Sequence, residues 1–217
     1  MMMHRRTLLA PVLLGALFAS LALPARASAP LAAPLTAQDQ TDLTRVEGYL
    51  NGIKAITARF LQVAPDGAVS QGNAWLQRPG NMRFEYDKPS PYLMVAGFGS
   101  FIFYDAELNQ TTSVPLATTP LSILLGDKVE LKGGVTVTNI DRQPGVLQVT
   151  MVRTSSPEDG SLTLVFADQP LALRQWVVTD GQHQETRVSL FGIEPGGPFP
   201  ARMFEFKDPR LQDNRQN

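Results

Sequence analysis

The sequence of 217 residues contains no cysteine and only two histidines, His4 and His183. Without cysteine the chain cannot form a disulfide, use a thiol as nucleophile or metal ligand, or carry a lipid on a cysteine. His183 follows Asp180-Gly181 in a polar stretch, which is typical of an exposed turn and a poor setting for the base of a catalytic triad. No group of histidine and acidic residues has metal-ligand spacing. We therefore expect no metal, no cofactor and no enzymatic activity.

The sequence also lacks an apolar run long enough for a membrane-spanning helix. Its N-terminal run, Leu8 to Leu23, has 16 residues, fewer than the roughly 18 to 20 that are needed. The basic start His4-Arg5-Arg6 precedes this run and the small-residue stretch Ala25–Ala29 follows it. This order is that of a secretory signal peptide, so we predict that residues 1–29 are cleaved and do not anchor the chain.

An excess of positive charge is missing as well. The predicted signal contains three arginines and no acid, so the remaining 188 residues (217 minus 29) carry 16 basic and 20 acidic side chains, a net charge of −4. This charge does not favour nucleic acid or an anionic membrane surface. The length suits one domain, residues 30–217, and export without a lipid-bearing cysteine predicts an untethered protein of the periplasm.

Helix signals occur near the start of this domain and strand signals after it. Thr36-Ala-Gln-Asp39 resembles a capping box, and Leu43, Val46, Leu50 and Ile53 follow at helical spacing, which predicts an amphipathic helix ending near Asn51-Gly52. From Ile56 onward, short runs rich in Val, Thr and aromatic residues alternate with turn signals. These signals are Pro65-Asp66-Gly67, Pro79-Gly80, Gly97 to Gly99, Gly133-Gly134, Pro144-Gly145, Asp159-Gly160 and Asp180-Gly181. The pattern predicts a mainly β fold, a meandering antiparallel sheet with few helices.

One strand shows how this sheet divides its faces. Between Met82 and Asp87, apolar side chains alternate with charged ones, so one face is expected to be buried and the other wet. The chain contains 11 Phe and 7 Met, a soft apolar lining for its size. A large one-sided sheet can cover such a face by curling on itself and placing helices over the opening.

A second, short helix is predicted from Thr119 to Gly126. Thr119 suits the N-cap, Pro120 the first turn and Gly126 the end. Its apolar residues cover most of its circumference, which fits either a plug in an ordinary core or a lid with an additional apolar partner.

Two sets of charged residues could have functional roles. Glu85 and Asp87 share one strand face about 7 Å apart, like a pair of catalytic acids, but this face is the one expected to be wet. Arg78 alternates with Ala74 and Leu76, so it is either an exposed turn residue or a partly buried one. If buried, its guanidinium requires acceptors, and the C-terminal carbonyls of a short helix would supply them.

Several segments together resemble the periplasmic outer-membrane lipoprotein carrier (LolA) family. They are Phe60-Leu-Gln62, Gly72-Asn-Ala-Trp-Leu-Gln-Arg-Pro-Gly80, Phe84-Glu-Tyr86, Ile102-Phe-Tyr-Asp105 and Thr119-Pro-Leu121. The Trp-x-x-Arg-Pro-Gly hairpin is the most specific of them, and the similarity spans most of the chain after the signal.

The resemblance implies a half-open antiparallel β-barrel whose hydrophobic cavity lies under a helical lid. The cavity would take up the acyl chains of lipoproteins released by an ATP-driven (ABC-type) inner-membrane complex and pass them to an outer-membrane acceptor. Arg78 would be the lid latch, Pro79 and Met82 the hairpin contacts for a partner, and the protein a monomer. The implied cavity residues are Trp75, Leu76, Phe84, Tyr86, Met94, Ile102 and Tyr104, and the lid residues are Pro120, Leu121, Ile123, Leu124 and Leu125.

Two other functions are compatible with the sequence. A periplasmic regulator on a similar half-barrel would bind lipoproteins and signal through a protein partner. A secreted lipid hydrolase is a third hypothesis, which the near-absence of histidine disfavours.

Overall fold

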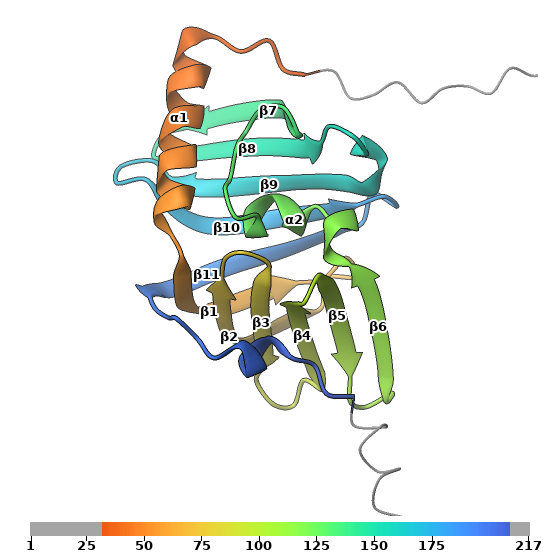
Figure 1. Ribbon diagram of the computed structural model, residues 1–217. Helices are drawn as coiled ribbons and strands as arrows, with labels where there is room; N and C mark the ends of the chain where they lie inside the picture. Colours follow the sequence, from red (N-terminus) through yellow and green to blue (C-terminus); the bar gives the residue numbers. More distant parts are fainter. Residues whose placement is uncertain (1–31, 209–217) are drawn as a thin grey trace, which may run out of the picture.

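The computed structural model describes residues 32–208, in which eleven antiparallel strands form one open sheet (Figure 1). The strands are β1 (Ala55–Val63), β2 (Val69–Gln77), β3 (Asn81–Tyr86), β4 (Tyr92–Gly97), β5 (Ser100–Asp105), β6 (Gln110–Pro115), β7 (Val135–Gln143), β8 (Val146–Arg153), β9 (Gly160–Ala167), β10 (Ala172–Asp180) and β11 (Glu185–Pro195). Their spatial order is β6-β5-β4-β3-β2-β1-β11-β10-β9-β8-β7, so β6 and β7 are the two edges. The predicted half-open antiparallel barrel is confirmed, and the predicted signal peptide lies outside the described residues.

Most neighbouring strands are consecutive in the chain because short turns join them. Six of the seven turn signals recognised in the sequence lie between consecutive strands, whereas Gly133-Gly134 ends the long connection before β7. The β2–β3 turn, for example, contains Gly80 at φ 73°. Glycine suits this position because a side chain disfavours a positive φ. The long connection from β6 to β7 leaves the sheet edge and carries a 3₁₀ turn, η1 (Leu116–Thr118), and the short helix α2 (Leu121–Leu125).

The first helix, α1 (Ala37–Gly52), crosses the concave side of strands β7 to β10 (Figure 1). Thr36 and Asp39 form the predicted capping box, and the helix ends where the sequence predicted. Its apolar side chains Leu43, Val46 and Leu50 are buried in the core. Here Tyr49 contacts Phe166 of β9 edge-to-face, with ring centroids 5.8 Å apart.

Charged side chains also fasten α1 to the sheet. Arg142 of β7 donates from Nε to Asp42 Oδ2 over 2.8 Å and also bonds Asp39, while Arg45 bonds Asp168. Hydrogen bonds from Thr36 and Arg142 lower the pKa of Asp39 to about 2. Burial by itself would raise the pKa of Asp42, but the hydrogen bonds that it accepts, including that from Arg142, lower it overall.

The helix α2 lies over the middle of the concave side (Figure 1). It begins after Pro120, one residue later than predicted, because the Thr119 hydroxyl bonds the Leu116 carbonyl and does not cap the helix. Gly126 ends it as predicted. The following loop returns over α1, where the Asn51 side chain exchanges two hydrogen bonds of 2.9 Å with the backbone of Val129. Within residues 32–208, no helix has the length and apolar character needed to cross a membrane.

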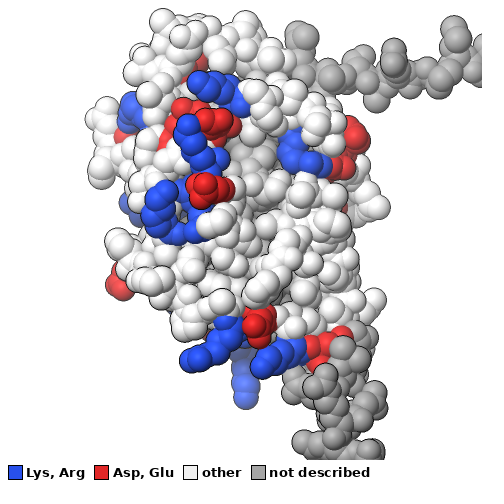
Figure 2. Space-filling model, in the orientation of Figure 1, with Lys and Arg blue, Asp and Glu red and all other residues white. Residues whose placement is uncertain are grey.

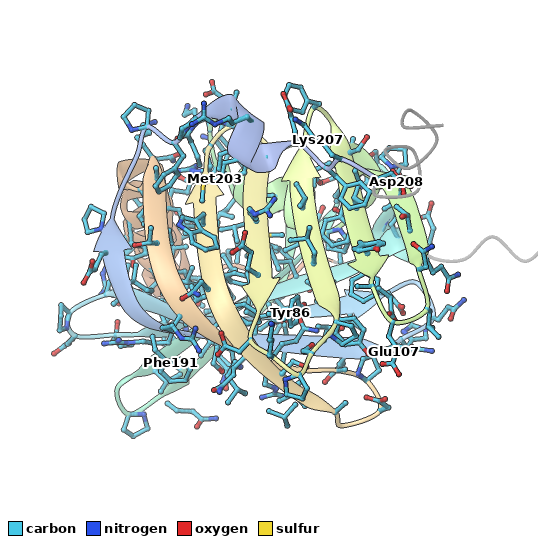
Figure 3. All side chains as sticks on the ribbon, turned by 90° about the horizontal axis from the view of Figure 1, so that it is seen from below. Tyr86, Glu107, Phe191, Met203, Lys207 and Asp208 are labelled. Atoms are coloured by element: carbon cyan, nitrogen blue, oxygen red, sulfur yellow. The ribbon has the colours of Figure 1, made fainter. Side chains whose placement is uncertain are left out.

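The convex side of strands β3 to β5 is covered by the C-terminal segment, which contains η3 (Ala201–Phe204). Figure 3 shows this segment, with Met203 and Lys207, beside strand ends opposite the end where Tyr86 lies. Arg83 of β3 donates to the Met203 carbonyl over 3.1 Å, and Phe204 is fully buried. The C-terminal segment therefore packs against one end of β3 to β5 on the convex face.

Candidate functional site: an apolar cavity beneath α2

A cavity of about 320 Å³ lies between α2 and the concave side of the sheet. Its apolar lining consists of Met82, Phe84, Met94, Phe101, Val114, Pro120, Leu121, Trp176, Val178 and Val188. Figure 2 shows charged side chains gathered along α1, whereas the surface over α2, above the cavity, is free of them. The volume is at the lower end of the range of about 300–1,000 Å³ that is usual for ligand pockets.

Both halves of the curled sheet contribute to this cavity. Strands β3 to β6 supply one wall, and β10 and β11, which come from far along the chain, supply the other. The ring of Phe84 on β3 meets that of Trp176 on β10, with centroids 6.0 Å apart. This contact joins the two walls, and the lining around it offers few groups that can hydrogen-bond a polar ligand.

The structure places the seven predicted cavity residues in three different settings. Phe84 and Met94 line the cavity. Leu76 is on the same concave side but is packed in the core next to Met82. Tyr86 is also on this side, where its hydroxyl donates to Gln62 Oε1 over 2.8 Å and burial raises its pKa. Contact of Phe84 and Met94 with an acyl chain remains a prediction.

Trp75, Ile102 and Tyr104 lie on the opposite, convex face, which corrects their prediction as cavity residues. Trp75 pairs with Arg83, whose side chain points to the C-terminal segment, and Tyr104 contacts Phe206 with ring centroids 5.4 Å apart. The reason is strand alternation. Trp75 precedes Leu76, which faces inward, so Trp75 faces outward. In the run from Phe101 to Tyr104 every residue is apolar or aromatic, so the sequence does not reveal which two face inward. The structure turns Phe101 inward instead.

The sequence missed the cavity residues of the second wall, Trp176, Val178 and Val188. The segments that carry the family resemblance end at Leu121, before these strands begin. Alternation along Trp176, Val178 and Asp180 could have placed them on one face, but not opposite β3.

The β2–β3 turn was predicted to present Pro79 and Met82 to a partner. Met82 is only 1% exposed and lines the cavity, so its prediction as a surface contact is corrected. It is the first inward residue after the turn, and the alternation of β3 buries it together with Phe84. Pro79 is partly exposed at the turn, and contact with a partner remains a prediction for it.

Arg78, in the same turn, is partly buried and bonded to the end of α1. Its Nε donates to the Ile53 carbonyl over 3.1 Å, and its Nη2 donates to the carbonyls of Leu50 and Ile53. Burial lowers the pKa of Arg78, and the nearby Asp127 carboxylate opposes this effect. The sequence correctly predicted that carbonyls at the C-terminal end of a helix accept from Arg78. The helix is α1, however, and not the short helix.

The turn also holds α2 through the backbone, since the Gly80 amide donates to the Leu125 carbonyl over 2.8 Å. A single turn of three residues therefore bonds the C-terminal ends of both helices that cover the sheet. Because all these bonds use helix-end carbonyls, they can break without unwinding either helix.

The residues predicted for the lid divide between the cavity and the core. Pro120 and Leu121 line the cavity, whereas Leu124 and Leu125 are buried in the core, 4% and 1% exposed. Ile123 is also buried, on the side toward the loop before β7. The helix α2 is thus a lid at its N-terminal end and part of the core at its C-terminal end.

The residues considered for catalysis are separated by ion pairs. Glu85 bonds Arg83 over 2.7 Å, and Asp87 bonds Arg59, so each acid has its own cation on the convex face. His183 sits in the β10–β11 turn at φ 61°. In the part of the chain that the structure describes, no group of three or more His, Cys, Asp or Glu side chains is arranged to hold a metal ion.

The fold and this site define a half-barrel with a lidded apolar cavity of ligand size. Residues 51–207 match the family model described as outer membrane lipoprotein carrier protein LolA. The chain belongs to this family.

The chain is similar in sequence to curated relatives over most of their length. The outer-membrane lipoprotein carrier protein of Chromohalobacter salexigens is 30% identical, covering 85% of this chain and 92% of that protein. Those of Azotobacter vinelandii and Methylococcus capsulatus are 29% and 27% identical, covering 81% and 79% of this chain and 88% and 86% of theirs. Among solved structures, a LolA superfamily protein of Nitrosomonas europaea is 8% identical with a TM-score of 0.40, covering 76% of this chain and 97% of that one.

Proposed function

We propose that this protein is a non-enzymatic carrier of the periplasm that shields the acyl chains of lipoproteins in transit between the inner and outer membranes. The observation that carries the proposal is the lidded cavity, whose lining is largely aromatic and aliphatic. The family membership supports the same role, because the curated relatives are named as outer-membrane lipoprotein carrier proteins.

The need for such a carrier follows from the hydrophobic effect. Burying one CH₂ group is worth about 0.8 kcal/mol, so the acyl chains of one lipoprotein represent on the order of tens of kcal/mol when exposed to water. The apolar cavity walls and the apolar face of α2 offer surface on which this cost is avoided. A protein that performs only this shielding needs no catalytic group.

The cavity of about 320 Å³ is small for several acyl chains. Uptake of several chains would therefore require α2 to move away from the sheet, and the arrangement described here would be the closed form of the carrier. The bond of Gly80 to the Leu125 carbonyl opposes this movement directly, and the bonds of Arg78 to the end of α1 fix the turn that carries Gly80.

The bonds that oppose opening of the cavity would also assist release of the cargo. A hydrogen bond to a charged group is worth about 1.5–3 kcal/mol, so the closed form has a competing stabilisation that lowers the net affinity for cargo. A carrier without it would hold its cargo too tightly to hand it over. Arg78 is thus proposed as the latch, as the family resemblance implied.

The proposal includes the partners and the maturation of the chain. The protein would lose residues 1–29 on export, act as a monomeric domain of residues 30–217, receive cargo from an ABC-type inner-membrane complex and deliver it to an outer-membrane acceptor.

A transfer experiment tests the proposal. Residues 30–217 are mixed with inner-membrane vesicles containing the releasing complex, ATP and a labelled lipoprotein, and then with vesicles bearing the acceptor. The proposal predicts a soluble complex after the first step and labelled acceptor vesicles after the second. Retention of the lipoprotein without delivery would indicate a sensor, and cleavage of its acyl chains would indicate a hydrolase; either result would overturn the carrier function.

A further inference from the structure

The cavity is polar at one end, a feature that the binding of acyl chains does not explain. Its polar lining consists of Gln62, Thr118, Thr119, Asp159, Asp180 and Thr186. The strand register brings the last three together: Thr186 pairs with Val178, and Asp180, two residues further along β10, pairs with Gly160, which follows Asp159. Polar side chains on β10, β11 and η2 (Pro157–Asp159) therefore meet at the end of the cavity away from Trp176.

Three uncharged residues of the cavity lining can also bind a ligand by hydrogen bonds. Gln62 accepts the Tyr86 hydroxyl at Oε1, so its amide nitrogen is the group with which it can donate to a ligand. The hydroxyls of Thr118 and Thr119 donate to the carbonyls of Pro115 and Leu116, each over 2.8 Å. This fixes both hydroxyls and leaves their oxygens as acceptors.

The two carboxylates differ in their partners. Asp159 bonds Arg153, so a cation compensates its charge. Asp180 accepts from the backbone amides of Gln182 and Gln184 at Oδ1, over 2.8 and 2.9 Å, which fixes the side chain in the β10–β11 turn without a cation. Among the described side chains that line the cavity there is no Lys or Arg. The polar end therefore carries uncompensated negative charge.

We propose that this polar end selects the head group of the cargo: it accepts uncharged groups such as the esters and amides that join acyl chains to a protein, and it disfavours anionic heads. The inference rests on the proposed carrier function and specifies its ligand. An amphiphile whose chain occupies the apolar part has its head near Asp180 and Asp159. A carboxylate or phosphate there meets the like charge of Asp180, which is exposed at this end of the cavity, so the repulsion is strongest at low ionic strength.

This selection would protect the carrier from the wrong ligands. Free fatty acids and anionic phospholipids offer the same hydrocarbon chains as a lipoprotein, so an apolar cavity cannot reject them. A negatively charged group at the end of the cavity can reject these competitors, because they bring an anionic head group to that end and a lipoprotein does not.

The test compares dodecanol with dodecanoic acid at pH 8 in the displacement of an uncharged fluorescent acyl probe. Dodecanoate is more soluble than dodecanol and binds any apolar site less well. The quantity compared between variants is therefore the affinity for dodecanol divided by the affinity for dodecanoate. At low ionic strength we expect this ratio to fall about threefold in Asp180→Asn, which retains the amide-accepting oxygen but removes the charge.

Asp105→Asn is the matched control, because Asp105 also accepts two backbone amides in a hairpin turn, those of Glu107 and Leu108, but does not line the cavity. Thr186→Lys, on the neighbouring strand, provides an independent test, since a cation at the polar end should raise the affinity for dodecanoate relative to dodecanol.

An unchanged ratio in Asp180→Asn, or no gain for dodecanoate in Thr186→Lys, would overturn the head-group selection while leaving the carrier function intact. Failure of the wild-type protein to bind the probe or either ligand would instead contradict the proposed function itself.

Discussion

Arg78 lies in the turn between β2 and β3 and donates from Nε to the carbonyl of Ile53, over 3.1 Å, where α1 ends. The Ile53 carbonyl lies just before β1, which pairs with β2, whereas the second acceptor of Arg78, the Leu50 carbonyl, belongs to the last turn of α1, the helix that covers β7 to β10. Movement of the end of α1 away from the β2–β3 turn is thus opposed by the bond from Arg78 to Leu50.

Arg78→Leu removes the donors and keeps an apolar stem of similar length. We expect about tenfold tighter binding of an acyl probe and slower transfer of lipoprotein to the acceptor, because the closed form no longer competes with cargo. Probe titration and transfer kinetics measure the two effects. Arg174→Leu on the exposed surface of β10 is the control, and transfer at the wild-type rate by a folded Arg78→Leu protein would contradict the latch.

Filling the cavity should abolish binding without unfolding the protein. Val178 lines the cavity, so the larger side chain in Val178→Phe occupies space that is empty in this form. We expect a loss of acyl-probe affinity of at least about tenfold with little change in stability, since the added ring gains contacts instead of displacing neighbours. Titration and urea unfolding measure the two.

Val165→Phe makes the same change on the other face of the adjacent strand β9, where alternation turns residue 165 away from the cavity. Its probe affinity should equal that of the wild type. Equal loss of affinity in both variants would mean that the Val178→Phe effect is not due to filling of the cavity.

The sequence was sufficient to predict the features that depend on local chemistry. The capping box of Thr36 and Asp39 and the Pro79-Gly80 hairpin are encoded within a few residues, and both are present. The side of each strand was not always predictable: alternation placed Phe84 correctly, but the uniformly apolar run containing Ile102 has no alternation to read.

Features that depend on distant parts of the chain were not predictable. Trp176 contacts Phe84 in the cavity wall although 91 residues separate them (176 minus 84, less one). The acceptors of Arg78 were predicted as helix-end carbonyls because a buried guanidinium requires them, but only the tertiary structure shows that they belong to α1.

Adding one methyl group at Gly97 of β4 should release the C-terminal segment from the sheet. A Cβ at position 97 would lie 2.3 Å from the backbone oxygen of Phe204, a distance that real contacts do not allow. We expect Gly97→Ala to displace this segment, expose Phe204 and cost about 1–3 kcal/mol of stability. Hydrogen exchange of residues 199–208 and urea unfolding measure the effect.

Gly134→Ala is the matched control, because a Cβ there meets nothing within 4 Å. It should leave both the exchange pattern and the unfolding midpoint close to those of the wild type. Unchanged exchange of residues 199–208 in Gly97→Ala would show that the segment is not held against β4.

Stability should fall in acid partly through Asp39. Its pKa in the folded protein is about 2, below the ordinary value of 3.8. A carboxylate with a lowered pKa stabilises the folded state above its unfolded pKa, and this contribution is lost as the pH falls from about 4 toward 2. Asp39→Asn should therefore be less stable than the wild type at pH 7, and the difference should shrink between pH 4 and pH 2.

Urea unfolding at pH 7, 4 and 2.5 measures this difference. Asp66→Asn, in the β1–β2 turn, is a control that removes one carboxylate away from α1. A stability difference for Asp39→Asn that is constant across these pH values would contradict the role assigned to its ionised form.

The most direct test of the account is whether the protein binds a lipoprotein through its acyl chains. Residues 30–217 are incubated with a purified acylated lipoprotein and, separately, with the same protein made without its lipid, and complexes are separated by size. The account predicts a one-to-one complex with the acylated form alone, lost in Val178→Phe. Equal binding of the unacylated form, or an acylated complex that survives in Val178→Phe, would contradict it.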